Sequence, residues 1–72
     1  MENSTQVSLT VNGEEKTFSK QLSLSELVVE LGITNQRIAI ARNGQVVPKA
    51  EHNEQLISNN DKIEIVRMVG GG

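Results

Sequence analysis

The 72-residue sequence contains no cysteine, tryptophan or tyrosine, and Phe18 is its single aromatic residue. Without cysteine it can form neither a disulfide nor a thiolate metal site, and it cannot carry sulfur on a side-chain thiol. Bases stack on aromatic side chains, and phosphates bind clustered basic ones. Because the seven Lys and Arg residues are scattered within a net charge of −2, we expect no nucleic acid partner.

The sequence also lacks a long apolar run. Its first residues are polar and acidic, unlike a signal peptide, and no run approaches the roughly 20 apolar residues that cross a bilayer. We therefore expect no membrane partner and a cytoplasmic location. A monomer is the default expectation for the free chain.

The short length leaves room for one hydrophobic core. Nearly every apolar residue is needed to offset the entropy of folding, so a ligand pocket of roughly 300 Å³ is hard to accommodate. We expect a protein on which other enzymes act, and not an enzyme with its own pocket.

Polar and apolar residues alternate over residues 6–12, which predicts a half-buried strand. Asn12 and Gly13 form a tight-turn signal and are followed by Glu14 and Glu15. A returning strand is predicted over residues 16–19, with Phe18 turned inward.

A helix is predicted to begin at Ser23, because Ser23 and Glu26 have the spacing of a capping box. Its apolar residues repeat at the spacing of one helical face. They are Leu24, Leu27, Val28 and Leu31. Gly32 supplies the left-handed residue that ends the helix, and Ile33 can fold back as in a Schellman motif.

A second hairpin is predicted from residues 37–42, the turn residues Asn43 and Gly44, and the strand Gln45–Val47. Pro48 ends it because proline cannot donate to a ladder. The polar residues 49–55 are interpreted as a surface connection with one helical turn at most.

Residues 62–69 form the last predicted strand. The order of hairpin, helix, hairpin and strand predicts an α+β protein with the β-grasp (ubiquitin-like) fold, in which a mixed sheet of four to five strands grips one main helix. The last strand is placed beside the first and parallel to it. One domain is expected over residues 1–69, with 1–5 frayed, followed by a flexible glycine tail over 70–72.

The last strand is predicted to turn Ile63 and Ile65 toward the helix, but Val66, Met68 and Val69 break the alternation. These three residues are either packed within the strand or exposed as a partner-binding surface near the tail. Both alternatives remain open for Val66, whereas the flexible thioether of Met68 favours a partner contact.

Gly70, Gly71 and Gly72 directly follow this strand and close the sequence. Terminal glycines are often only a frayed end or a linker. However, a segment without Cβ atoms passes through a narrow channel, and three residues reach about 10 Å. We therefore expect the Gly72 carboxylate to enter the active site of another protein, where activation as an acyl-adenylate prepares it for attack by sulfur.

Over residues 7–72 the sequence resembles the ThiS family of sulfur carriers in thiamine biosynthesis. The resemblance rests on residues 11–14, 24–27, 38–48, 61–66 and 69–72. One departure is Asn60, where the family usually has glycine; since asparagine also tolerates positive φ, we expect the turn to be retained.

The resemblance implies that an E1-like adenylyltransferase of the ThiF type, using ATP and magnesium, adenylates the carboxylate of Gly72. Sulfur from a persulfide donor then gives a thiocarboxylate, and a thiazole synthase of the ThiG type receives that sulfur. Gly71 and Gly72 match the terminal pair of the family, and Gly70 supports them. The chain itself is expected to bind no cofactor.

Three alternatives remain. A related β-grasp carrier, such as the small subunit of molybdopterin synthase (MoaD type), would use the same terminal chemistry. A ubiquitin-like modifier would be joined to a lysine of its target, and a plain binding module would leave the tail without a role. The sole histidine, His52, is interpreted as a solvated loop residue in preference to a general base or a metal ligand.

Overall fold

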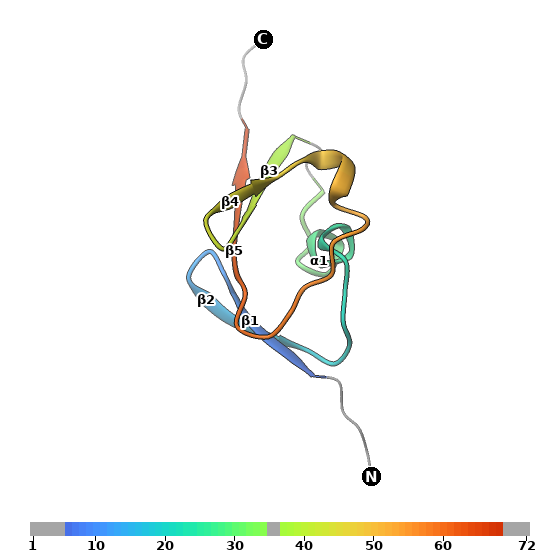
Figure 1. The fold of residues 1–72 in the computed structure, drawn as a ribbon, viewed down its shortest axis with the longest axis vertical. Helices are drawn as coiled ribbons and strands as arrows, with labels where there is room; N and C mark the ends of the chain where they lie inside the picture. The colour runs from blue at the N-terminus through green and yellow to red at the C-terminus, as the bar shows by residue number, and fades with distance from the viewer. Residues whose placement is uncertain (1–5, 35–36, 69–72) are drawn as a thin grey trace.

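The computed structural model describes residues 6–34 and 37–68, so the predictions for residues 1–5 and 69–72 lie outside the described part of the chain. Figure 1 shows a curved sheet with one helix packed across its concave side. The elements are β1 (Val7–Val11), β2 (Glu14–Phe18), α1 (Leu24–Glu30), β3 (Ile38–Arg42), β4 (Gln45–Val47), a 3₁₀ turn η1 (Lys49–Glu51) and β5 (Lys62–Arg67).

The five described strands form one sheet in the order β2-β1-β5-β3-β4. β5 lies parallel to β1 and antiparallel to β3, and both hairpins are antiparallel. The prediction that the last strand lies beside the first and parallel to it is confirmed. A mixed sheet that packs against one main helix is the predicted β-grasp arrangement.

Strand boundaries differ most from the sequence prediction at β2 and β5. β2 begins at Glu14 and not at residue 16, because Asn12 and Gly13 form a two-residue turn with φ of 52° and 85°. Val11 is therefore already paired with Glu14. β5 ends at Arg67, so the expected strand over residues 62–69 is shorter, and Val69 lies outside the described residues.

Both predicted ends of the helix are confirmed. The Ser23 hydroxyl accepts from the Glu26 N–H (3.1 Å), and the Glu26 carboxylate accepts from the Ser23 N–H (2.9 Å), which completes the capping box. At the other end Gly32 has φ of 76°, and the Ile33 N–H donates to the Val28 carbonyl in a Schellman motif. Within residues 6–34 and 37–68, no helix is long and apolar enough to cross a membrane.

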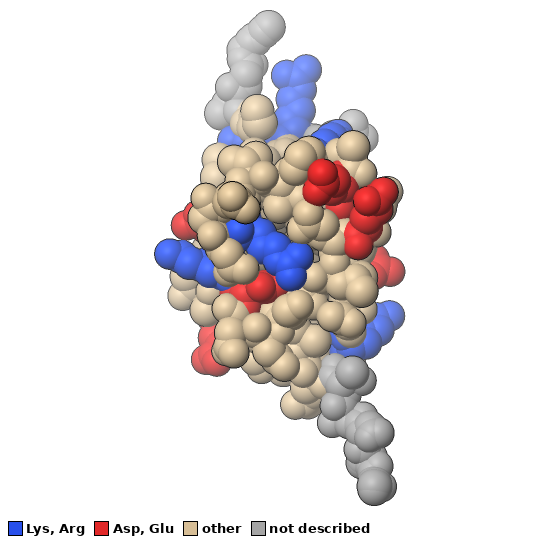
Figure 2. Space-filling view, viewed as in Figure 1, with Lys and Arg blue, Asp and Glu red and all other residues tan. Residues whose placement is uncertain are grey.

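Charged side chains are dispersed over the surface. On the face shown in Figure 2, basic and acidic groups lie interspersed among uncharged residues, with no broad area of either sign. One exposed pair, Lys16 and Glu14, is separated by 3.6 Å. Pairs of this kind contribute little to stability in water, so the fold depends on its core.

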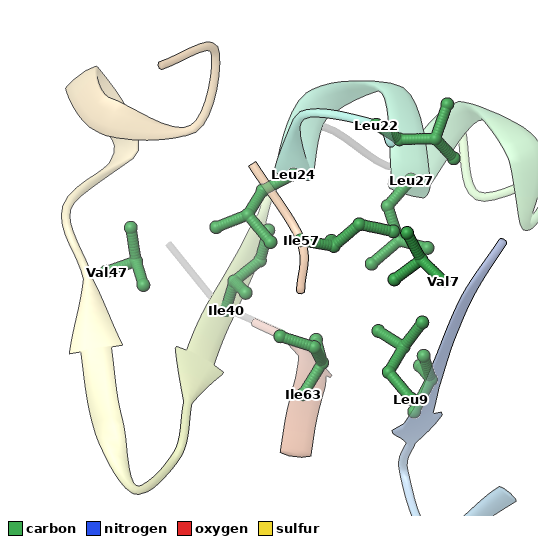
Figure 3. Packing of buried hydrophobic residues seen from close by; sticks show 10 residues of the cluster. Val7, Leu9, Leu22, Leu24, Leu27, Ile40, Val47, Ile57 and Ile63 are labelled. Atoms are coloured by element: carbon green, nitrogen blue, oxygen red, sulfur yellow. The ribbon is translucent and has the colours of Figure 1, made fainter. Parts of the chain in front are cut away.

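The core lies between the sheet and α1. Figure 3 shows side chains of the sheet pointing toward those of the helix, with Ile57 from the loop before β5 among them. The buried apolar cluster consists of Val7, Leu9, Val11, Leu22, Leu24, Leu27, Ile40, Val47, Ile57 and Ile63. Full burial of one such side chain contributes roughly 1.5–3 kcal/mol, so this cluster holds β5 in the middle of the sheet.

Residues 49–55 form a connection at the surface with one 3₁₀ turn, as expected, but one of these residues is buried. His52 is buried, and its Nε2 atom lies 3.1 Å from the Val47 carbonyl oxygen. Its own carbonyl accepts from the Ser25 N–H, and the Gln55 carbonyl accepts from the Leu24 N–H. The interpretation of His52 as a solvated residue is therefore wrong, because backbone bonds to the first turn of α1 draw this segment against the helix.

Candidate functional site at the end of β5

The structure describes the chain up to Met68, one residue before Val69 and the glycine tail. Val69, Gly70, Gly71 and Gly72, which carry most of the predicted site, lie outside the described residues. Figure 1 shows β5 running through the middle of the sheet toward one end of the molecule, and β1 beginning near the opposite end. The site is therefore built from the residues that hold β5 and from those exposed around its end.

Two asparagine side chains hold β5 from the two hairpin turns. Asn12 Oδ1 accepts from the Ile65 N–H (2.8 Å), and Asn12 Nδ2 donates to the Ile65 carbonyl (3.3 Å). Asn43 Oδ1 accepts from the Lys62 N–H (2.9 Å). Both asparagines have φ of 52°, a left-handed conformation that asparagine tolerates better than most residues. The turns thus fix the position of β5 as well as closing their hairpins.

A half-buried ion pair holds the second hairpin against the loop before β5. Arg42 Nη2 lies 2.9 Å from the Asp61 carboxylate, which also accepts from Asn43 Nδ2 (3.1 Å) and the Ser58 N–H (2.8 Å). Arg42 Nη1 donates to Gln55 Oε1 (3.0 Å). Because the buried carboxylate has three donors, its desolvation is compensated. The network connects the end of β3 to the start of β5.

Val66 and Met68 are both exposed, with 59% and 54% of their surface accessible. Val66 therefore points away from the helix and is not packed in the core, which decides between the two alternatives for its burial. Ile63 is fully buried and Ile65 is packed against the core, as predicted. The break in alternation therefore marks the place where β5 leaves the core.

Strand order brings further apolar residues to the same face as Val66. The register places Ala39 opposite Val66, and Val46 opposite Ala41. Val46 is 73% exposed, and the two alanines are half-buried. We call Ala39, Ala41, Val46 and Val66 the outer patch; it lies on the face of the sheet opposite to α1, next to Met68.

Sequence reasoning missed Val46 and the two alanines as site residues. The signal was present in the predicted strand over residues 37–42, where large residues alternate with alanines. However, their neighbours across the sheet depend on the strand order. These apolar side chains share their face of the sheet with the exposed Glu64, which is paired with Ala41. Exposed apolar side chains grouped in this way are typical of surfaces that contact other proteins.

The described residues offer little for catalysis. An open hollow of about 390 Å³ lies beside α1, and Lys20, Val29 and Glu30 are among its lining residues. The Glu26 carboxylate in this hollow already accepts from the Ser23 N–H in the helix cap. In the part of the chain that the structure describes, no group of three or more His, Asp or Glu residues could hold a metal ion.

Comparison with known proteins points to one family. A model described as the ThiS family matches residues 5–72. A thiazole synthase of Paramagnetospirillum magneticum is 39% identical over 64 residues, which are 89% of this chain and 20% of the relative. The chain thus spans about a fifth of the length of that relative. The sulfur carrier protein ThiS of Bacillus subtilis is 29% identical, with 89% of this chain and 98% of the relative covered.

The fold is shared with a solved structure. The crystal structure of the thiamine biosynthesis protein (ThiS) of Geobacter metallireducens superposes with a TM-score of 0.80 and 26% sequence identity. The superposition covers 92% of this chain and 100% of the other. The two chains therefore share the same overall fold.

Proposed function

The chain belongs to the ThiS family, and we propose that it is a sulfur carrier of thiamine biosynthesis whose working group is the carboxylate of Gly72. The observation that carries the proposal is the family match, which extends from residue 5 through Gly72 and so includes the whole glycine tail. The absence of cysteine supports it, because the terminal carboxylate is then the natural place to attach sulfur.

The proposed chemistry proceeds in three steps. A carboxylate oxygen attacks the α-phosphorus of ATP, and pyrophosphate leaves. The terminal sulfur of a persulfide then attacks the acyl carbon, and AMP leaves. Cleavage of the remaining S–S bond by a thiol gives the thiocarboxylate. ATP, magnesium and the persulfide belong to the partner proteins, and this chain supplies the acyl group.

The outer patch and Met68 provide the docking surface in this proposal. Ordering three glycines costs on the order of 3–6 kcal/mol, at 1–2 kcal/mol per residue. Contacts elsewhere on the domain must offset that cost. Val46 and Val66 are more than half exposed and belong to the sheet that holds the tail, so their burial against a partner can supply it.

Two enzymes are the proposed partners. An E1-like adenylyltransferase of the ThiF type activates Gly72, and a thiazole synthase of the ThiG type receives the sulfur. The second assignment is supported by the thiazole synthase relative, in which a segment similar to this chain makes up about a fifth of the protein. Such an arrangement places carrier and acceptor in one molecule, as expected if the two act on consecutive steps.

Intact-mass spectrometry tests the proposal. The chain is incubated with ATP, magnesium, an E1-like enzyme and a persulfide donor, beside a control truncated after Gly70. We expect a gain that matches replacement of one oxygen by sulfur, located on Gly72 and absent from the control. An unchanged mass with a demonstrably active enzyme contradicts the carrier function. An isopeptide-linked product would instead identify a protein modifier.

A further inference from the structure

The backbone of β5 presents alternate residues to its two neighbours. On the β1 side, the Ile63 carbonyl accepts from the Asn12 N–H (2.9 Å). On the β3 side, the Met68 N–H donates to the Arg37 carbonyl (2.8 Å). Since N–H and C=O groups alternate along an extended strand, odd-numbered residues of β5 face β1 and even-numbered residues face β3.

The β1 side of β5 loses its backbone partner at Asn12. There the chain turns away into the first hairpin with φ of 52°, and the Asn12 carboxamide pairs with both backbone groups of Ile65. The side chain thus takes the place of the next peptide group of β1. It extends the ladder by one residue and stops there.

Arg67 is the next residue on that side, and its edge is open. It stands opposite Ile38, but its N–H and C=O point away from β3. Within residues 6–34 and 37–68, no group donates to or accepts from them on the side away from β3. β5 therefore ends in a strand edge that has a neighbour on one side only, directly before the tail.

We propose that the E1-like enzyme contributes an extended strand that pairs with the backbone of Arg67 at this open edge. The strand would lie where β1 would continue beyond Asn12. The inference rests on the proposed function and adds the mode of recognition to it. Glycines offer no side chains, so an enzyme that recognises a glycine tail must use its main chain. Main-chain groups that enter a dry active site need hydrogen-bond partners, and strand addition supplies them.

The side chains next to the open edge indicate the chemistry of the incoming strand. Val66 is exposed on the outer face of the sheet, and the exposed Arg67 projects from the other face. Pairs across a ladder are favourable between apolar side chains and between opposite charges. The partner strand is therefore expected to place an apolar residue beside Val66 and an acidic residue beside Arg67.

Two variants separate the main chain of Arg67 from its side chain. Arg67→Ala keeps the N–H, whereas Arg67→Pro removes it. The proline is compatible with the fold, because this N–H does not bond to β3 and proline is accepted where a strand edge faces solvent. We expect the Pro variant to bind the E1-like enzyme about tenfold or more weakly than the Ala variant, since an interfacial acceptor loses its donor. Unchanged melting temperatures verify that both variants fold.

Amide hydrogen exchange of the unmodified chain gives an independent readout. In the free chain the Arg67 N–H should exchange fast and the Val66 N–H, which faces β3, slowly. Binding of the E1-like enzyme with ATP should slow Arg67 by about tenfold or more. This measurement requires no substitution, so it decides the question even if the Pro variant does not fold.

Equal binding of the two variants, or fast exchange of Arg67 in the complex, overturns the proposal. Slow exchange in the free chain that depends on its concentration places a second copy on the edge and also overturns it. These results are distinct from failure of the proposed function. A sulfur gain together with an unprotected Arg67 N–H contradicts only the proposed strand pairing. The absence of a sulfur gain in an active assay contradicts both the strand pairing and the proposed function.

Discussion

At the scale of single residues, two asparagines each form a hairpin turn and also hydrogen-bond to a third strand. The sequence predicts Asn12 and Asn43 as turn residues because each precedes glycine, and both indeed have positive φ. What the pattern does not reveal is that both side chains bind the backbone of β5. These contacts depend on which strand lies beside each turn, and the strand order cannot be derived from the local sequence. Asn60 likewise has positive φ, at 71°, so the expectation that the turn is retained with asparagine at this position is confirmed.

Substitution of these asparagines by glycine measures the second role. Asn12→Gly retains the left-handed conformation but removes both bonds to Ile65, so the free energy of unfolding should fall by about 1–2 kcal/mol more than in Asn60→Gly. Asn60 is the matched control because glycine fits its φ equally well and the entropy change of the unfolded chain is the same. Urea denaturation measures both. Equal losses in the two variants would show that the Asn12 carboxamide adds nothing to stability.

At the scale of the elements, α1 depends on its ends. It has seven residues, and a helix this short does not form alone in water. The capping box satisfies donors of the first turn, and the Schellman motif satisfies carbonyls of the last. Both motifs can be predicted from the sequence because they are local and their spacing is fixed.

The capping box can be tested by a pair of substitutions. Ser23→Ala removes the acceptor for the Glu26 N–H and should lower the free energy of unfolding by about 1 kcal/mol. Glu26→Gln keeps an acceptor for the Ser23 N–H and should stay within about 0.5 kcal/mol of the unmodified chain. Thermal and chemical denaturation give the values. A Gln variant as unstable as the Ala variant would assign the effect to the charge and not to the hydrogen bonds.

The connection between β4 and β5 shows where prediction from sequence ends. The polar residues 49–55 lie mostly at the surface, as predicted, yet His52 among them is buried. Backbone bonds to the start of α1, which is distant in sequence, pull it inward. Local periodicity carries no information on such contacts, whereas the alternation of β1 and the stripe of α1 are themselves consequences of a single buried face.

At the scale of the whole molecule, the site separates into a part that sequence reveals and a part that topology creates. The glycine tail and the break in alternation after Ile65 can be read from the sequence, which also favours exposure of Met68, whereas the exposure of Val66 is known only from the structure. The outer patch exists because β3 lies between β4 and β5, which places Val46 and the two alanines on the same face of the sheet as Val66. Neither hairpin nor strand alone predicts that neighbourhood.

The sheet has an outer face and a face that packs against α1. Two exposed valines, one on the outer face and one on α1, allow docking at the outer patch to be tested. Val46, on the outer face, is 73% exposed, and Val29, on α1 across the sheet, is 72% exposed. We prepare Val46→Lys and Val29→Lys, which add the same charge at equal exposure. Lysine is well tolerated on an edge strand and in a helix, so both melting temperatures should stay within a few degrees.

If the outer patch docks the activating enzyme, Val46→Lys should lower kcat/KM for adenylation of the chain about tenfold, because a buried valine contributes roughly 1.5–3 kcal/mol to an interface. Val29→Lys should stay within about twofold, as is usual for a surface substitution away from the contact. Pyrophosphate release gives both rates. Equal losses of kcat/KM in the two variants would show that the outer patch is not the docking surface, or that an added positive charge alone slows association. A loss confined to Val46→Lys would show that activation of the tail requires the outer face of the sheet, whose residues are brought together by the strand order.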